Sequence, residues 1–422
     1  MNIRFITQIL IVLTLSSKTL AGPTWNRLIN EMGLEPNKHT QAYCYLTEEG
    51  DIGGSRANDS VRIASVSKLY TSLWTVNKLG TNYKYTTTLY LKNDKLHIAG
   101  SKDPYFGREK IFFLLSELNR QGLRTFDSVT FDDDFYLYTG SAHTSYPEKP
   151  ARDTVKNKLA VYFDTDQWNL LSNYYKKTVK LFARHLDNSS LQLLDEVEIK
   201  AKKVAYSKRA PFDIEDSDVE VFHLDSPPVS RYLKFLNLIS DNYAAEMIFQ
   251  QLGGANTFNS YLKRNFSFSP SKVAFYTGSG LNTSINGKRE DNYSTCALTV
   301  EVIKSLRDSV KESQNLSLAD IMAVPGFDVY EGTFTKRLKQ FPGSLVAKTG
   351  TLKHTSALAG MLSTRNYGDV FFGIFNHTDI QETYKGWLLQ NEFVPSLIDA
   401  FGGPFTFEYQ YQKFFPISRP LY

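Results

Sequence analysis

Three short polar motifs, each at the edge of a predicted helix or strand, constrain the fold of this chain more than any other feature of its sequence. The first is Ser65-Val66-Ser67-Lys68, which begins a predicted helix over Ser65–Leu79 with apolar residues every three or four positions. A spacing of three places the Ser65 hydroxyl and the Lys68 amine on one helix face, one turn apart. The amine can therefore take the hydroxyl proton, and the N–H groups of the first helical turn favour negative charge there.

The second motif, Ser240-Asp241-Asn242, joins two predicted helices, Val229–Ile239 and Asn242–Leu252. A hydroxyl and an amide two positions apart can both point into one cleft. Ser-x-Asn also occurs at Ser284 and Ser313, but only the copy at Ser240 follows a long apolar helix and precedes another. The context therefore favours Ser240 and Asn242 as site residues, whereas Asp241 has no role that the sequence indicates.

The third motif, Lys348-Thr349-Gly350-Thr351, ends a predicted strand over Ser344–Ala347 and occurs once in the chain. Its glycine allows another backbone or a substrate to approach closely. A second Ser-x-x-Lys copy stands at Ser269 and Lys272, but a strand-like run, Val273–Tyr276, follows it. Because no helix holds that pair, we reject it as a catalytic motif.

Ser-x-x-Lys, Ser-Asp-Asn and Lys-Thr-Gly in this order are the motif set of serine β-lactamases and penicillin-binding proteins. The chain resembles the DacB-type D-alanyl-D-alanine carboxypeptidase/endopeptidases, which are class C low-molecular-mass penicillin-binding proteins. The resemblance implies an α/β (α+β) fold, in which an antiparallel sheet flanked by helices forms a transpeptidase-like domain. It is most specific around Ile63–Leu79, Ser226–Gly254, Tyr276–Leu281 and Val346–Leu362, with a glycine-led Asp-Pro stretch at Gly100–Phe106.

The resemblance also predicts the domain organisation. Residues 22–80 and 226–422 are expected to form the penicillin-binding domain, and residues 81–225 to form an insertion after the nucleophile helix. In the DacB type this insertion usually carries two extra domains. Here it is shorter, so we expect a reduced inserted domain and a more open cleft.

By resemblance, Ser65 attacks the carbonyl between two D-alanines and forms an acyl-enzyme, which water hydrolyses. Lys68 is then the general base, and Ser240 relays the proton to the leaving amine. Asn242 holds Lys68 and the substrate backbone. The like charge of Lys348 helps to lower the pKa of Lys68.

The substrate-binding residues follow from the same resemblance. Lys348, Thr349 and Thr351 are expected to bind the terminal carboxylate, and Gly350 to permit its close approach. Arg289 is either a partner for a side-chain carboxylate of diaminopimelate or a surface arginine. The implied partners are peptidoglycan and, as covalent inhibitors, β-lactam antibiotics.

Other classes of function fit the sequence less well. A serine β-lactamase would need fast deacylation, and no Glu-x-x-x-Asn segment lies between Ser240 and Lys348. A non-catalytic penicillin-binding wall sensor would not need the full set of catalytic side chains. No His-Glu-x-x-His spacing occurs, so no metal and no other cofactor is expected. A net charge of +4 gives no reason to expect nucleic acid, and the oligomeric state is left open.

The N-terminus predicts export. Residues 1–21 resemble a secretory signal, with Arg4, the apolar stretch Phe5–Leu15 and a cleavage site after Thr19-Leu20-Ala21. That stretch is too short to span a bilayer, so we expect a periplasmic or secreted protein without a transmembrane segment.

Three further expectations concern the fold. Cys44 and Cys296 could pair in an oxidising compartment, but their apolar neighbours favour buried free thiols. Leu159–Phe163 is expected to form a strand. The tail from Phe401 to Tyr422 alternates aromatic and polar residues, which predicts a docked strand.

Overall fold

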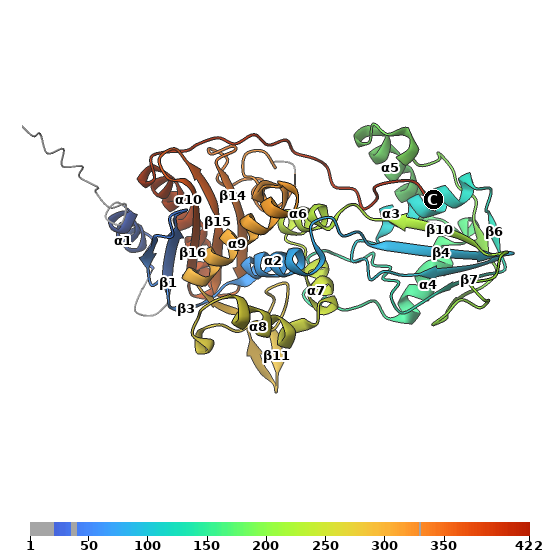
Figure 1. The fold of residues 1–422 in the computed structure, drawn as a ribbon, viewed down its shortest axis with the longest axis horizontal. Coiled ribbons are helices and arrows are strands. Elements are labelled where there is room, and N and C mark those ends of the chain that lie inside the picture. The colour runs from blue at the N-terminus through green and yellow to red at the C-terminus, as the bar shows by residue number, and fades with distance from the viewer. Residues whose placement is uncertain (1–20, 35–39, 329–330) are drawn as a thin grey trace, which may run out of the picture.

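The computed structural model describes residues 21–34, 40–328 and 331–422. The predicted signal peptide, apart from Ala21, lies outside these residues. Figure 1 shows two parts along the long axis of the molecule, each built around its own sheet. Within the described ranges, none of the helices combines the length and the apolar character that crossing a membrane requires.

The first sheet is antiparallel throughout and is built from both ends of the chain. β1 pairs with β16, so the N-terminal segment lies between the C-terminal strands and β2. The strand order is β14 (Leu345–Leu352), β15 (Thr355–Thr364), β16 (Gly368–His377), β1 (Gln41–Leu46) and β2 (Ile52–Ser55). This arrangement confirms the predicted antiparallel sheet flanked by helices.

Helices cover both faces of this sheet because its strands are apolar on both sides. Ala357 and Ala359 of β15 belong to one core cluster, which also contains residues of α2 (Ser67–Leu79) and α9 (Cys296–Gln314). The alternating Leu358 and Leu362 belong to the opposite cluster, with residues of α1 (Ala21–Glu31) and α10 (Thr383–Ala400). Figure 1 places β14, the motif strand, at the edge of this sheet.

Three helices and two small sheets complete the first part. Helices α6 (Val229–Ile239), α7 (Asn242–Gln251) and α8 (Gly254–Asn265) follow one another in the sequence. The sequence predicts α6 and α7 but not α8. The small sheets pair β3 (Ser60–Arg62) with β13 (Tyr293–Thr295) and β11 (Thr283–Ile285) with β12 (Lys288–Glu290).

The second part contains a mixed sheet with a separate hydrophobic core. Its strand order is β10 (Glu220–Asp225), β4 (Thr86–Lys92), β5 (Lys95–Ala99), β7 (Ser128–Phe131) and β9 (Val204–Tyr206). Its helices are α3 (Arg108–Arg120), α4 (Arg152–Tyr162) and α5 (Leu170–His185), and a short pair joins β6 (Thr125–Phe126) to β8 (Lys200–Ala201). We propose that residues 81–225 form one inserted domain around this sheet.

The prediction of a strand over Leu159–Phe163 is wrong, because most of this stretch belongs to α4. Val155, Leu159 and Tyr162 are buried at helical spacing and face the core of the second part. The apolar run itself cannot separate a buried helix from a strand, because both bury consecutive apolar residues.

The tail docks as predicted, but not as a strand. It runs from the first part to the second as irregular chain (Figure 1). Phe407 N–H donates to Gly343 O at 2.7 Å, and His223 N–H donates to Tyr422 O at 2.8 Å. Phe415, Ile417 and Leu421 are buried in the core of the second part. The tail therefore bonds to a different neighbour at each point and has no continuous strand partner.

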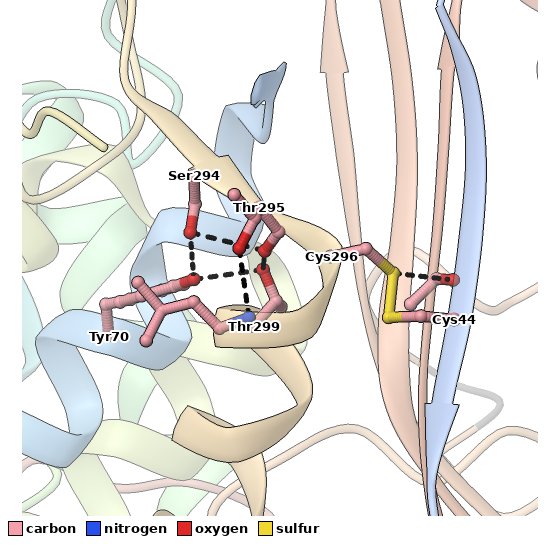
Figure 2. The surroundings of a disulfide bond; sticks show 8 residues. Cys44, Tyr70, Ser294, Thr295, Cys296 and Thr299 are labelled. Atoms are coloured by element: carbon pink, nitrogen blue, oxygen red, sulfur yellow. Dashed lines mark hydrogen bonds between the residues drawn. A yellow bond between two sulfur atoms is a disulfide. The ribbon is translucent and has the colours of Figure 1, made fainter. Parts of the chain in front are cut away.

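The expectation of free thiols is also wrong, since Cys44 and Cys296 form a disulfide. The bond joins β1 to the first residue of α9, and both cysteines are fully buried (Figure 2). Beside it, Tyr70 of α2 shares hydrogen bonds with Ser294 and Thr299. Helix α2 is thus attached to the segment that the disulfide fixes to the sheet.

Candidate active site

Ser65 lies in a short 3₁₀ helix, Ala64–Val66 (η2), that continues directly into α2. Ala64 adopts a left-handed conformation with φ of 47°, and two glycines pack against this turn. A Cβ atom on Gly280 would stand 1.9 Å from Ala64 O, and one on Gly350 would stand 2.9 Å from Ile63 O. Only glycine fits at these contacts, which bring the Lys-Thr-Gly strand against the segment that contains Ser65.

The Lys68 amine is fully buried and donates three hydrogen bonds. Its Nζ lies 3.0 Å from Ser65 Oγ, 2.8 Å from Asn242 Oδ1 and 2.7 Å from Ser279 O. Burial lowers the pKa of Lys68 to about 7, although the carboxylates of Asp241 and Glu246 act in the opposite direction. A neutral amine next to a serine hydroxyl can accept its proton, which is the chemistry that the motif predicts.

The turn between α6 and α7 directs two side chains toward two different lysines. Ser240 ends α6 in a left-handed conformation with φ of 58°, and Asp241 caps α7 by accepting a hydrogen bond from Ala244 N–H at 2.9 Å. This cap gives Asp241 the role that the sequence does not indicate. As a result, Asn242 reaches Lys68, while Ser240 Oγ lies 2.9 Å from Lys348 Nζ.

Lys348 lies on β14 and is as buried as Lys68. Its Nζ donates to Ser240 Oγ and, at 2.8 Å, to Thr349 O. Burial, and then the charge of Lys68, hold the pKa of Lys348 well below its usual range. The site therefore contains two buried amines whose pKa values burial lowers, each next to a serine hydroxyl.

The remaining predicted residues fall into two groups. Thr349, Gly350 and Thr351 follow Lys348 on β14, where Thr349 is nearly buried and Thr351 is exposed. Arg289, on β12, makes a two-nitrogen ion pair with the buried Asp291. The assignment of Arg289 to a substrate carboxylate therefore stays a prediction.

Two contacts in the site have no signal in the sequence. Asn292 Nδ2 donates to Ser67 Oγ at 3.0 Å and to Thr277 O at 2.7 Å, which ties the Gly278–Leu281 stretch to α2. Asn242 N–H donates to Ala142 O at 2.7 Å, so a loop of the second part holds Asn242. Both contacts join residues far apart in the sequence, which a local motif cannot reveal.

The described residues contain no group of three or more His, Cys, Asp or Glu side chains arranged to hold a metal ion. Residues 46–153 and 176–387 match the D-Ala-D-Ala carboxypeptidase 3 (S13) family.

Among solved structures, the chain is similar to Bd3459, a predatory peptidoglycan endopeptidase from Bdellovibrio bacteriovorus. The identity is 28% and the TM-score 0.80, and the match covers 90% of this chain and 98% of that one. Bd3459 has also been solved in a penicillin G-acylated form. Bd0816, another predatory endopeptidase of that organism, matches at 25% identity with a TM-score of 0.80, over 90% and 99% of the two chains.

Two further matches are more limited, either in identity or in coverage. Penicillin-binding protein 4 (DacB) from Haemophilus influenzae shares the fold at 16% identity and a TM-score of 0.53, over 87% of this chain and 99% of that one. A curated relative, penicillin-sensitive carboxypeptidase A of Dictyostelium discoideum, is 27% identical over 188 residues, which are 39% of this chain. This chain spans only 33% of that relative's length. Because the S13 match includes all three motifs and most of the sequence, the chain belongs to the D-Ala-D-Ala carboxypeptidase 3 (S13) family.

Proposed function

We propose that this protein is a penicillin-sensitive serine DD-peptidase that acts on the stem peptides of peptidoglycan, both as a carboxypeptidase and as an endopeptidase. The observation that carries the proposal is the buried Lys68 amine, 3.0 Å from Ser65 Oγ and with a pKa of about 7. A base with that pKa is half neutral at physiological pH, where it can activate a serine without a histidine.

In the first half of the reaction, Ser65 Oγ attacks the carbonyl carbon between two D-alanines, and Lys68 takes the hydroxyl proton. The resulting oxyanion binds to the backbone N–H groups of Ser65 and Thr351, a kind of contact worth roughly 3–4 kcal/mol per donor. Ser240, held by Lys348, relays this proton from Lys68 to the leaving amine, so that Lys68 is neutral again. The peptide C–N bond then breaks and leaves an ester on Ser65.

In the second half, water attacks that ester and Lys68 again acts as base, so Ser65 is regenerated. Lys348, Thr349 and Thr351 hold the terminal carboxylate of a carboxypeptidase substrate. The inserted region has one five-stranded sheet and a short strand pair, which supports a cleft that is open enough for a cross-linked peptide, whose leaving side is a second stem. Bd3459, itself a peptidoglycan endopeptidase, matches over nearly its whole length and supports the same activity here. Such a substrate implies export, in agreement with the predicted signal peptide.

Digestion of intact peptidoglycan sacculi tests the proposal, with the released muropeptides identified by mass spectrometry. Loss of terminal D-alanine from pentapeptides shows carboxypeptidase activity, and a falling ratio of dimers to monomers shows endopeptidase activity. Labelled penicillin should form a stable adduct on Ser65. Rapid turnover of the drug would instead indicate a β-lactamase, and an adduct without any muropeptide change would indicate a sensor.

A further inference from the structure

Glu246 is a buried carboxylate that the proposed reaction does not use. It lies on α7 one turn after Asn242 and is 7% exposed. Its Oε2 accepts hydrogen bonds from Gly278 N–H at 2.9 Å and from Ser279 N–H at 3.2 Å. Its Oε1 accepts from Gln250 Nε2 at 3.0 Å. A buried charge is costly unless it is bonded, and each oxygen of this carboxylate accepts at least one hydrogen bond.

The hydrogen bonds of Glu246 connect it, through Ser279, to Lys68, which is the general base of the proposed reaction. Ser279 donates its N–H to Glu246, and its carbonyl oxygen accepts a hydrogen bond from Lys68 Nζ at 2.7 Å. Asn242 and Glu246 stand four residues apart, so they share one face of α7. That face therefore supplies one acceptor of the Lys68 amine directly, through Asn242, and fixes the other, the Ser279 carbonyl, through Glu246.

We propose that Glu246 is a positioning residue for Lys68: it holds the Ser279 carbonyl against the amine and places a negative charge nearby. The inference rests on the proposed function, in which Lys68 is the general base. Because Asn242 Oδ1 and Ser279 O are held in place, the Lys68 amine stays directed toward Ser65 Oγ. That precision raises the rate of proton transfer.

The charged groups around Lys68 come from two elements. Helix α7 contributes Glu246 and, at its N-terminal end, Asp241, whose charge is in turn influenced by His143 and Tyr105. Strand β14 contributes Lys348. The groups that contact Lys68 from η2 and from the Ser279 loop are neutral. Both carboxylates raise the pKa of Lys68 against the larger effect of burial, so removing either charge lowers it further.

Two variants separate the effect of the Glu246 charge from the effect of its side-chain length. Glu246→Gln keeps an oxygen acceptor for the two N–H groups but removes the charge. Because Lys68 works in its neutral form, the acid limb of the pH profile of acylation should move to lower pH, by roughly one unit. Its maximal rate should stay within about threefold of wild type, since the contact geometry is kept.

Glu246→Asp gives the opposite pattern. It keeps the charge but is one methylene shorter, so it loses contact with the Gly278 and Ser279 N–H groups. The acid limb should stay within a few tenths of a unit, while the maximal acylation rate falls about tenfold or more. The measured quantity is the second-order rate constant of acylation by labelled penicillin between pH 5 and 9.

Glu148→Gln is the matched control. Glu148 lines the same 170 Å³ cavity as Glu246 and Ser279, but it is exposed. Removing its charge should leave both the acid limb and the maximal rate unchanged. Thermal unfolding of each variant checks that it is folded.

The outcomes separate the two proposals. If wild type is not acylated on Ser65, the proposed function fails. If wild type is acylated but Glu246→Gln leaves the acid limb in place, or moves it no more than Glu148→Gln does, the charge role is overturned. A normal maximal rate in Glu246→Asp overturns the positioning role, and this variant decides alone if Glu246→Gln does not fold.

Discussion

Ser65-x-x-Lys68 and Ser269-x-x-Lys272 have the same spacing, and a 3₁₀ helix lies at each. The first 3₁₀ helix continues into the 13 residues of α2, whereas the second ends at Val273, which is extended. Lys68 is fully buried, and its amine reaches Ser65, Asn242 and Ser279. Ser269 is exposed and bonds to Ser271, while Lys272 donates to Asn58 O.

The comparison shows that the chemistry of a Ser-x-x-Lys motif depends on the residues that pack around it. The partners of Lys68 come from η2, α7 and the Ser279 loop, and Lys348 of β14 adds a second buried amine. In the second copy Lys272 is only partly buried, and no helix follows that would hold its amine next to the serine. The following predictions test how far this difference extends.

The largest expected effect is the loss of covalent labelling. Ser65→Ala should abolish acylation by penicillin and hydrolysis of muropeptides, because it removes the nucleophilic hydroxyl next to Lys68. Ser269→Ala should leave both unchanged. Labelling is read by intact-protein mass spectrometry, with thermal unfolding as the control for folding. A penicillin adduct that persists in Ser65→Ala and is lost in Ser269→Ala would assign the nucleophile to Ser269 and contradict this prediction.

Removal of the base should have the next largest effect. Lys68→Ala should slow acylation by about 10²–10⁴-fold, the usual contribution of a general base. Raising the pH should restore little of this rate, since the group itself is missing. Lys272→Ala is the matched control and should acylate at the wild-type rate. Near-normal acylation of Lys68→Ala in a stopped-flow assay would contradict the assignment of the base.

The pH dependence of wild-type acylation gives a smaller and more diagnostic effect. Burial lowers the pKa of Lys68 to about 7, and only the neutral amine is a base. The rate should therefore rise through pH 7 to a plateau above it and be about a hundredfold lower at pH 5. An acid limb near the pKa of an ordinary lysine, far above pH 7, would show that burial does not tune the amine.

Removal of the disulfide should affect stability before activity. The bond closes a sequence separation of 252 residues and anchors the start of α9, which packs beside α2. A double Cys44→Ala, Cys296→Ala variant should lose about 2–5 kcal/mol in free energy of unfolding, measured with guanidinium chloride. Acylation of Ser65 at 25 °C should stay within a few-fold of wild type. An unchanged unfolding midpoint would mean that packing alone supports the nucleophile helix.

The smallest effect is expected at Arg289. Arg289→Ala should raise the KM for a diaminopimelate-containing peptide by a few-fold, as expected for a half-exposed ion pair, and leave kcat unchanged. Penicillin has no such side chain, so its acylation of Ser65 is the internal control. An equal loss with both acyl donors would indicate that Arg289 supports the local fold through Asp291 and does not bind substrate.

The sequence predicts this molecule best where the signal is local. Helix α6 begins and ends at the predicted residues because its apolar spacing and the turn at Ser240 lie within one short stretch. The same applies to Lys68, whose relation to Ser65 is fixed by helix geometry. The sheet and the helices on it are predicted through the family resemblance that the three motifs carry.

The predictions that failed or were missed concern contacts between residues far apart in the sequence, or apolar patterns that fit either a helix or a strand. Nothing in the spacing of Cys44 and Cys296 shows that β1 and α9 meet. Leu159–Phe163 is apolar enough for either a strand or a helix. Glu246 carries no motif of its own, since its function depends on the Ser279 backbone, which approaches it only in the folded chain.

The tail has a consequence for the order in which the molecule is assembled. A ribosome makes the residues around Ser65 early, but the strand that packs against them, β14, is made nearly three hundred residues later. Leu421 and Tyr422 of the tail bond to Glu117 and His223 in the other part. The tail contacts between the two parts can therefore form only after β14 and all the segments before it have been made. A chain that stops before the tail would contain the strands of both main sheets but would lack these contacts between the two parts.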